Sequence, residues 1–444
     1  MAILESQTCD VEASRCKRLL EGGFGMPTEN ADATGAMLQD SIRLLGSVPL
    51  RAIVCSHLGH EVARHVAVAR YVSRSVLEAK ASGESLLVAA GSAIEPWVAR
   101  ASVLFGVPMV RLHLGRERKS IEETSGKHPL RELHLPFGAD ERRDEFVVLL
   151  ADRVDCVYVR ARGRLFSAIG KRLQTDASPQ TRIAVHPTLA DQMKRPLHRL
   201  MDQGAVGWYR HHGRTAASPE VGRAFLEWNE SDEQGTWKAQ VADDWVFDQD
   251  EWLIHCTRGC SGPWPGQSTE GYRDELLLAD ETNPLELQRS PLGSLHRILR
   301  MNRLIGNHVV SRTRFRVVCF SADSLQNVLG RRKFRPHLHR WDCEPYGIAI
   351  RKSAATQCGI APVIYGPKQR RRELPDADAY RFQARGETYD WTEEKEWRCL
   401  GDVDLSDFRT GDVKVFVGES CDAERLHTRC SVTAVSTLSE IVAG

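Results

Sequence analysis

The sequence predicts an α/β domain built on a parallel sheet, followed by an α+β domain that is mainly β. Between residues 50 and 186, short apolar runs alternate with helical periodicity, which is typical of βαβ units. After about residue 240, the apolar runs lie between glycine, proline and aspartate residues and rarely alternate with helices. The chain has 444 residues, which indicates two or three domains at about 100–200 residues per domain.

The first half repeats one pattern of strand, turn and helix. Residues 50–55 form an apolar run, after which Val62, Val66 and Ala69 recur at helical spacing. Repetition of this pattern predicts a doubly wound, Rossmann-like unit. A charged loop is expected at residues 115–145. The other strand-like runs cover residues 85–90, 107–112, 154–159 and 182–186.

These patterns also predict the domain boundaries. Residues 1–45 are expected to form an irregular arm with a short helix, 46–200 the Rossmann-like nucleotide-binding domain, 201–240 a connector and 241–444 an α+β catalytic domain. In the last of these, helical periodicity is mostly confined to residues 268–305. Its strand-like runs cover residues 252–255, 315–320, 346–350, 361–365, 397–400 and 413–417.

The composition excludes several classes of protein. Hydrophobic residues make up 42% of the chain and charged residues 27%, as in ordinary globular proteins. Lys+Arg (60) and Asp+Glu (59) nearly cancel, so any binding to nucleic acid must be local. The sequence shows neither an export signal nor the roughly 20 apolar residues that a membrane span needs. We therefore expect a cytoplasmic protein with no membrane partner.

The cysteine and histidine patterns predict no metal site. The 12 cysteines are scattered singly among apolar positions, as is typical of reduced thiols in a core. Cys256 and Cys260 are spaced like a metal-binding pair, but no second pair follows at finger-like spacing. His337 and His339 lie in a basic run, which disfavours a cation.

Polar turns at strand ends give the N-terminal domain its candidate site. Ligands of open parallel sheets bind beyond the carboxyl ends of strands. Gly91 and Ser92 follow one predicted strand in this way, and residues 56–59 and 162–163 follow two others. Gly91 would allow close approach of a phosphate, and Ser92 would cap the next helix or donate to a phosphate oxygen. A tight turn with an N-cap is the purely structural alternative.

With these turns, residues 45–190 resemble the Rossmann-like superfamily that includes the DNA-processing protein A and the cytokinin-activating phosphoribohydrolases. The resemblance depends on the strand, the turn from Gly91 to Glu95 and the helix that follows. It implies that this domain binds a nucleotide or nucleic acid.

Reactive and aromatic residues gather at strand ends of the second half. His255, Thr257 and Arg258 leave one predicted strand together and lead into a loop rich in glycine, proline and tryptophan. Each group alone is as well explained by a structural turn or a solvated run of charge. Together they supply hydroxyl, carboxylate, cationic and aromatic groups. The other members of the set are Ser321, Trp341, Tyr346, Glu394 and Glu396.

Along the chain, histidine and threonine come first, serine lies in the middle and two glutamates come last. In this order the segment resembles the ADP-ribosyltransferase fold, particularly bacterial toxin and phage-defence proteins. Residues 346–365 and the Glu394 to Arg398 segment also resemble abortive-infection proteins of uncharacterised families. The resemblance covers residues 245–420 and implies an ADP-ribosyltransferase-like domain that uses NAD in antiphage defence.

The resemblance implies a role for each residue. Glu396 would bond the ribose hydroxyl and stabilise an oxocarbenium-like transition state. Glu394 would steer the acceptor, and Ser321 would brace the pocket wall. The implied contacts to NAD are His255, Thr257 and Arg258, with Tyr346 or Trp341 stacked on the nicotinamide ring.

Two basic clusters interrupt the otherwise neutral chain, and Trp264, Phe334 and Trp341 interleave with them. Cations for phosphates and aromatic faces for bases favour binding of DNA or RNA, whereas a solvated basic loop is the structural alternative. The first cluster comprises Arg331, Arg332, Lys333, Arg335 and Arg340, and the second comprises Arg370, Arg371 and Arg372.

Three functional hypotheses follow. The first is ADP-ribosyl transfer from NAD to a nucleic-acid acceptor in antiphage defence. The second is a DNA- or RNA-directed glycosylase or nuclease that does not use NAD. The third is a non-enzymatic regulator that binds nucleotides or nucleic acid.

Overall fold

The chain divides into two compact units in the computed structural model. Unit 1 comprises Met1–Gly213 and Thr269–Ala279, and unit 2 comprises Arg214–Ser268 and Asp280–Gly444. In the described part of the chain, no helix has the length and apolar character that crossing a membrane requires. The structure describes residues 2–24, 42–43, 45–59, 62–114, 120–124, 130–135, 142–175, 180–186, 190–209, 238–241, 244–248, 250–260, 262–279, 289–308, 315–335, 340–385, 390–426 and 434–438.

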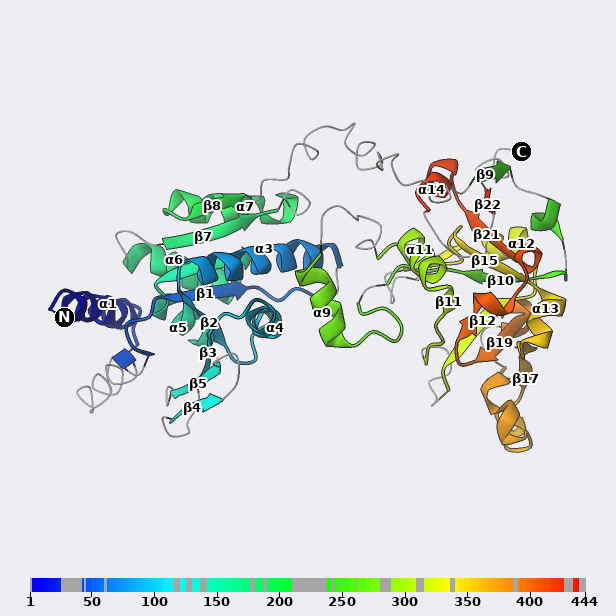
Figure 1. The fold of residues 1–444 in the computed structure, drawn as a ribbon, viewed down its shortest axis with the longest axis horizontal. Coiled ribbons are helices and arrows are strands. Elements are labelled where there is room, and N and C mark those ends of the chain that lie inside the picture. The colour runs from blue at the N-terminus through cyan, green and yellow to red at the C-terminus, as the bar shows by residue number, and fades with distance from the viewer. Residues whose placement is uncertain are drawn as a thin grey trace. The chain divides into compact units, whose positions relative to one another are not determined.

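Unit 1 is built on an 8-stranded sheet in the order β4-β5-β3-β2-β1-β6-β7-β8 (Figure 1). The strands from β5 to β8 are parallel, and β4 is antiparallel to β5. This is the α/β, Rossmann-like arrangement that the alternation predicts, and the strand order reverses between β1 and β6. The strands are β1 (Leu50–Cys55), β2 (Ser85–Ala89), β3 (Met109–Leu114), β4 (Ser120–Thr124), β5 (Leu130–Leu135), β6 (Arg153–Tyr158), β7 (Gln180–Val185) and β8 (Val206–Tyr209).

The helices of unit 1 form two packed groups. Right-handed crossovers place the helices that follow β1 and β2 on one face of the sheet and those that precede and follow β6 on the other. Accordingly, α3 and α4 pack on each other, and α1, α5 and α6 pack together. The helices are α1 (Ala2–Glu21), α3 (Val62–Ala81), α4 (Glu95–Phe105), α5 (Arg143–Leu150), α6 (Arg164–Thr175) and α7 (Ala190–Asp202).

A helix from later in the chain completes unit 1. Helix α9 (Thr269–Leu277) packs against α3 and α4. The Tyr272 hydroxyl lies 2.9 Å from Nδ1 of His65, and Asp274 accepts two hydrogen bonds from Arg100, at 2.5 and 2.7 Å. The helical periodicity of residues 268–305 therefore contributes α9 to unit 1 and α11 (Pro291–Met301) to unit 2.

The N-terminal helix is longer than the short helix that the sequence predicts. Helix α1 has 20 residues and is fastened by Arg15, whose side chain is fully buried. The Arg15 guanidinium donates to Asp152 at 3.2 Å and to the carbonyls of Gly46 and Val48 at 2.9 and 2.8 Å. Asp152 lies 137 positions away in the sequence, so local patterns carry no sign of this partner.

Unit 2 contains a second 8-stranded sheet, in the order β16-β19-β12-β10-β15-β21-β22-β9. It is mixed, since β21, β22 and β9 are parallel and the other pairs are antiparallel, and the mainly β character that the sequence predicts is confirmed. Its strands are β9 (Lys238–Val241), β10 (Trp252–Cys256), β12 (Val317–Ser321), β15 (Gly347–Arg351), β16 (Ala361–Pro362), β19 (Glu396–Leu400), β21 (Val413–Val417) and β22 (Ala434–Thr437). The shorter elements are β11 (Arg303–Leu304), α12 (Leu325–Gly330), β13 (Lys333–Arg335), β14 (Arg340–Asp342), α13 (Lys352–Gln357), β17 (Ile364–Gly366), β18 (Phe382–Ala384), β20 (Val403–Asp404) and α14 (Ser420–Glu424).

The two faces of this sheet carry separate cores. Because side chains alternate along a strand, Leu253 and Ile254 point to opposite faces. Leu253 belongs to the core that includes Leu295 of α11, and Ile254 belongs to the core that includes Leu325 of α12. We call these the α11 face and the α12 face.

Three strands of unit 1 lie where the sequence predicts none. Strands β4 and β5 occupy the expected charged loop, and β8 occupies the expected connector. In β5, Arg131 and Glu132 precede Leu133, so the strand lacks an apolar run. Residues 210–237 of the expected connector lie outside the described residues.

Candidate functional site

The strand order of unit 1 reverses between β1 and β6, which is where doubly wound sheets bind ligands. The Ser56 amide donates to the Tyr158 carbonyl at 2.8 Å, and the Ser56 hydroxyl accepts from the Arg160 amide at 3.1 Å. Gly59 and Arg162 adopt the left-handed conformation, with φ of 69° and 62°. These bonds join the ends of β1 and β6 and occupy the Ser56 hydroxyl.

The Gly91 turn at the end of β2 differs from its predicted form. Gly91 has φ 68°, and its amide donates to Glu95 at 3.2 Å. The residue that caps α4 is Ile94, without a side-chain bond, so the prediction that Ser92 caps the helix is wrong. Within the described residues, Ser92 Oγ is buried and has no hydrogen-bond partner. Buried hydroxyls are nearly always hydrogen-bonded, so the Ser92 hydroxyl is unusual in lacking a partner here.

In unit 2, Glu394 and Glu396 lie at the entrance to β19. The 3-10 helix η7 (Trp391–Glu394) ends at Glu394, and β19 begins at Glu396. Lys395 between them is left-handed, with φ 44°. The two glutamates therefore do not share a face of one continuous strand, as a period of two would require, although Glu396 is close enough to raise the pKa of Glu394.

Glu396 is held by a buried cation. The Arg398 side chain, only 1% exposed, donates from Nε and Nη2 to the two carboxylate oxygens of Glu396 at 3.0 and 2.9 Å. The same guanidinium donates to the carbonyls of Tyr380 and Phe382 at 3.1 and 3.3 Å and to Oε1 of Gln383 at 3.0 Å. Arg398 thus fixes the orientation of the Glu396 carboxylate and ties β19 to the segment that leads into β18.

Glu394 is partly buried, and no group among the described residues hydrogen-bonds to its carboxylate. Burial raises the pKa of Glu394, and the negative charge of Glu396 raises it further, while Arg331 and Arg258 act in the opposite direction. A carboxyl group that retains its proton to higher pH beside a second, fixed carboxylate is the arrangement that general acid catalysis uses.

Ser321 supports the Glu394 turn from the neighbouring strand. Its hydroxyl donates to the Glu394 carbonyl at 2.8 Å, and Ser321 lies opposite Glu396 in the β12–β19 ladder. Asp323 accepts from Arg331 at 2.6 Å, which directs the guanidinium toward this turn. Burial alone would raise the pKa of Asp323, but hydrogen bonds from Asn327 and Arg331 lower it.

His255 and Thr257 do not join this cluster. Ser321 pairs with the residue before His255, so the His255 side chain points to the α11 face, away from Ser321 and Glu396. His255 Nδ1 lies 2.8 Å from the Cys319 carbonyl, and burial lowers the pKa of His255 to about 4. The buried Thr257 hydroxyl donates to the Pro291 carbonyl at 2.9 Å. Both side chains thus bind main-chain carbonyls.

The other predicted NAD contacts are dispersed. The Tyr346 hydroxyl donates to Asp422 at 2.8 Å, and burial together with Asp422 raises the pKa of Tyr346. Trp341 is exposed on β14, and Arg258 is exposed but close enough to Glu394 to lower its pKa. Of the predicted set, the structure brings together Ser321, Glu394 and Glu396, with Arg258 nearby.

The first basic cluster lies on a short hairpin with exposed aromatic rings. Phe334 and Trp341 are paired across β13 and β14, are 40% and 42% exposed, and have ring centroids 5.4 Å apart. The Arg332 guanidinium lies over the Trp341 ring at 4.6 Å, and Lys333 is exposed. For Arg340 the structure describes the main chain alone, and His337 and His339 lie outside the described residues. Arg331, Arg332 and Arg335 are paired with Asp323, Glu344 and Asp342, respectively.

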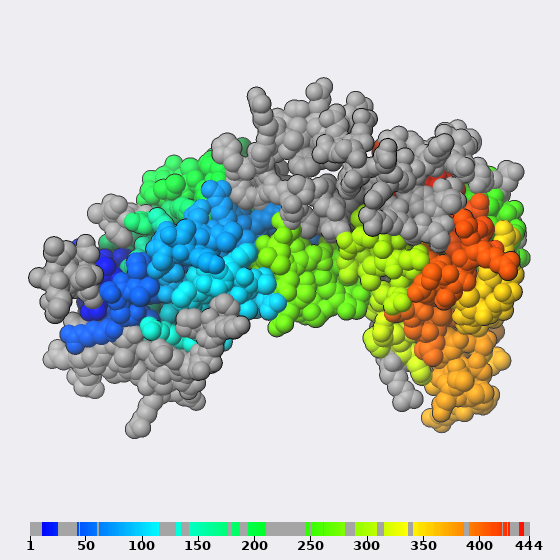
Figure 2. All heavy atoms as spheres, viewed as in Figure 1, coloured from blue at the N-terminus to red at the C-terminus, as the bar shows by residue number. Residues whose placement is uncertain are grey.

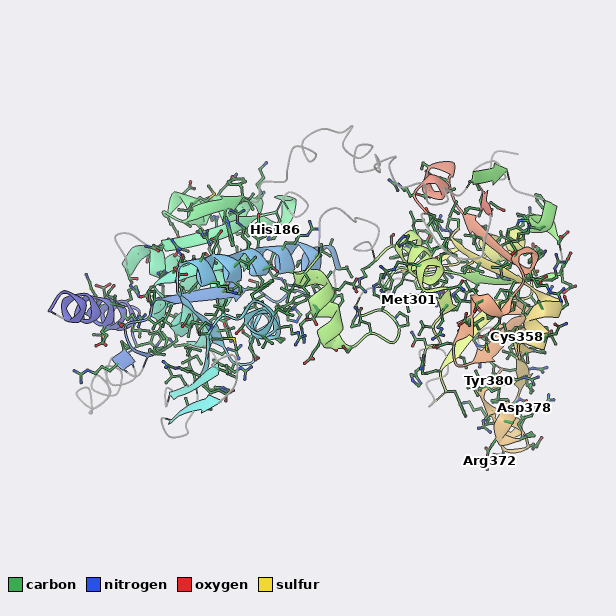
Figure 3. All side chains as sticks on the ribbon, viewed as in Figure 1. His186, Met301, Cys358, Arg372, Asp378 and Tyr380 are labelled. Carbon is green, nitrogen blue, oxygen red and sulfur yellow. The ribbon has the colours of Figure 1, made fainter. Side chains whose placement is uncertain are left out.

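The second basic cluster lies on another element. Arg370, Arg371 and Arg372 belong to the 3-10 helix η5 (Lys368–Arg372), between β17 and β18. This segment, orange in Figure 2, projects from unit 2, and Figure 3 labels Arg372 at its end. Arg370 donates to the Tyr365 carbonyl at 3.2 Å.

The structure adds Arg398 and Asp323 to the site. Residues two apart on a strand share a face, so the Glu396-x-Arg398 spacing is a local sign of an ion pair. No comparable spacing links Asp323 to Arg331, because their approach depends on how α12 leads into β13.

No protein-family model matches the chain, and no curated protein matches it. Solved structures that match include the molybdenum cofactor carrier protein of Chlamydomonas reinhardtii, at 13% identity over 36% of this chain and 89% of that one, with TM-score 0.25. DNA processing protein A of Streptococcus pneumoniae matches at 13% identity over 38% and 60%, with TM-score 0.27. The molybdenum cofactor binding protein of Rippkaea orientalis matches at 12% identity over 40% and 95%, with TM-score 0.24. None of these three is an ADP-ribosyltransferase, and likenesses this weak leave the function to the site itself.

Proposed function

We propose that unit 2 is an enzyme that cleaves the glycosidic bond between base and sugar in nucleic acid. In this proposal Glu394 transfers a proton and Glu396 provides a fixed negative charge. The observation that carries it is the pairing of an unbonded, partly buried Glu394, whose pKa is raised, with a Glu396 carboxylate that Arg398 holds in place.

Cleavage of a glycosidic bond needs these two groups. The leaving base must gain a proton or a hydrogen bond, and the sugar develops positive charge in the transition state. A protonated Glu394 would supply the proton, because its raised pKa keeps it neutral to higher pH. The Glu396 carboxylate would stabilise the cationic sugar, because its orientation is already fixed by the two bonds from Arg398.

The β13–β14 hairpin supports nucleic acid as the substrate. Phe334 and Trp341 offer exposed rings for base stacking. Lys333 supplies positive charge for phosphates, together with Arg332, whose guanidinium also bonds to Glu344 at 3.0 Å. Strand β13 of the hairpin begins two residues after Arg331. The charge of Arg331 acts on Glu394, so Arg331 connects the stacking surface to the two carboxylates.

The residues present do not fit the NAD site that the resemblance implies. His255 faces the α11 side of the sheet, and the hydroxyls of Thr257 and Tyr346 are bonded to the Pro291 carbonyl and to Asp422. We therefore favour base release from DNA or RNA over ADP-ribosyl transfer from NAD. A role in antiphage defence stays a prediction.

Unit 1 is proposed to recognise a nucleotide or nucleic acid at the ends of its parallel strands. The support for this is the left-handed Gly91 beside the buried, unbonded Ser92 hydroxyl. Both are suited to a phosphate oxygen.

The test incubates the full chain with single- and double-stranded DNA and RNA and, in parallel, with NAD labelled in the adenosine half. We expect free base from nucleic acid, and a loss of roughly 10²–10⁴-fold in Glu394→Gln, because the proton donor is removed. The matched control is Glu393→Gln, which changes the exposed neighbouring glutamate.

Each other outcome overturns the proposal. Label transfer to nucleic acid would establish the NAD-dependent reaction, and strand scission without base release would establish a nuclease. Salt-dependent binding without turnover would establish a regulator. Equal rates for Glu394→Gln and wild type would remove Glu394 from the site.

A further inference from the structure

Three side chains that can ligate a metal meet on one face of β3 and β5 in unit 1. His113 lies opposite His134 in the parallel ladder, and Glu132 precedes His134 by two residues on the same face. One ligand atom from each of the three lies within 4.8 Å of the other two. The backbone positions of all three are therefore set by two hydrogen-bonded strands and not by a loop.

The distances between these atoms suit a metal ion better than hydrogen bonds. Glu132 Oε2 lies 3.7 Å from Nε2 of His113 and 4.0 Å from Nε2 of His134, beyond the length of a hydrogen bond. Zinc bonds to imidazole and carboxylate are about 2.0–2.2 Å long, so atoms around a tetrahedral ion lie roughly 3.3–3.5 Å apart. Because the planes of the two imidazoles are nearly parallel, at least one ring must turn before both rings can ligate one ion.

The two imidazoles lie face to face, and one ring nitrogen has no partner among the described residues. Their rings stack with centroids 4.2 Å apart and planes inclined by 13°. Within the described residues, His113 Nε2 is buried and has no hydrogen-bond partner, which is rare for a ring nitrogen. Burial and the adjacent His134 lower the pKa of His113, which favours the neutral ring that metal binding requires.

Arg111 orients the carboxylate from the other side. Its Nη1 lies 2.6 Å from Glu132 Oε1, which leaves Oε2 facing the two imidazoles. Arg111 Nε also lies 3.0 Å from Glu95, so Glu95 balances the charge of the guanidinium and the charge of Glu132 remains for a cation. Carboxylates that ligate a metal are usually held by hydrogen bonds from neighbouring groups, as Arg111 holds Glu132 here.

We propose that His113, Glu132 and His134 bind one divalent transition-metal ion of the zinc class. Two imidazoles and one carboxylate favour Zn²⁺ over Mg²⁺ or Ca²⁺, which prefer oxygen ligands. Three protein ligands leave a coordination position open for water or an anion. The site lies near the carboxyl ends of β3 and β5, and Glu95 links it to the Gly91 turn. This inference concerns unit 1 and is independent of the reaction proposed for unit 2.

The experiment titrates chelator-treated, metal-free full chain with Co²⁺ and then with Zn²⁺. We expect about one Co²⁺ per chain, displaced by Zn²⁺, with a visible spectrum that lacks thiolate-to-cobalt charge transfer because no cysteine is a ligand. His113→Ala and Glu132→Gln should each weaken Zn²⁺ binding at least about tenfold. The matched control is His198→Ala, which removes an exposed histidine of α7 in the same unit and should bind as wild type does.

Glu132→Gln keeps the size of the side chain, so the test stands if His113→Ala does not fold, as judged by circular dichroism. Failure of the wild-type chain to bind Co²⁺ or Zn²⁺ would overturn the proposal. Unchanged affinity in Glu132→Gln, or a spectrum with thiolate charge transfer, would also overturn it, because the ion would then have other ligands.

Discussion

Asp155 of unit 1 and Glu394 of unit 2 have opposite surroundings. In unit 1, the fully buried Asp155 accepts hydrogen bonds from Arg51 at 3.1 Å, from Ser75 at 2.6 Å and from Arg182 at 2.7 and 2.8 Å. In unit 2, Glu394 is partly buried, and no described group bonds to its carboxylate. Full pairing makes Asp155 part of the scaffold, whereas an unpaired carboxyl is available to exchange a proton. Pairing therefore distinguishes Asp155 from Glu394.

The largest loss in the free energy of unfolding should come from Asp155→Ala. It removes one of the two carboxylates that Arg51 and Arg182 share, the other being Glu78, and breaking a buried pair in this way costs about 3–5 kcal/mol. Hydrogen exchange of peptides from β1 and β6 measures this loss in unit 1 directly. The exposed control Glu393→Gln should stay within about 0.5 kcal/mol of wild type. A loss below about 1 kcal/mol for Asp155→Ala would show that its pairing does not stabilise unit 1.

Ser75→Ala should cost roughly 1.5–3 kcal/mol, since its hydroxyl bonds to a charged group. The matched variant on the same helix is Ser73→Ala, whose hydroxyl bonds to the neutral Leu277 carbonyl at 2.7 Å and should cost about 0.5–1.5 kcal/mol. Urea unfolding compares the two. Equal losses would contradict the view that the charge of Asp155 sets the difference.

Ser321→Ala should cost about 1 kcal/mol, because the Glu394 carbonyl loses its hydroxyl donor. If that bond positions the turn, base release should also fall, since Glu394 would no longer be held beside Glu396. Urea unfolding and the base-release assay measure the two effects. Reduced stability with full activity would show that Ser321 supports the fold alone.

The smallest effect on stability, and one of opposite sign, should come from Glu394→Gln. Burial and Glu396 raise the pKa of Glu394 in the folded protein, so the folded chain holds the proton to higher pH than the unfolded chain does. The stabilisation linked to that proton is complete below the unfolded pKa of about 4.3 and is lost as the pH rises through the folded pKa. Glu394→Gln should therefore melt slightly above wild type at pH 7 and show no advantage below about pH 4. Melting temperatures across this range test it, and a lower value for the variant at pH 7 would mean that Glu394 has a stabilising partner.

Periodicity predicts the central strands well because burial on both faces demands continuous apolar residues. Strand β1 covers residues 50–55 as predicted, and the runs at 252–255 and 413–417 correspond to β10 and β21. The edge strand β4 and its neighbour β5 carry charged residues, so neither contains an apolar run that would predict a strand. Because β5 was not predicted, the candidate metal ligands on it were missed as well. The expectation of no metal considered only pairs that are close in the sequence.

The sequence by itself determined the central strands and the helices between them, because the spacing of apolar residues must match the period of the element that buries them. It also placed Ser321 and the two glutamates at strand ends. Only the tertiary structure decided which of these groups meet. Register put His255 on the face opposite Ser321, a left-handed Lys395 turned Glu394 out of the strand, and Arg398 took both oxygens of Glu396. The placement of His255 relative to Ser321 depends on the pairing of distant strands, and a single residue of register changes the face on which a side chain lies.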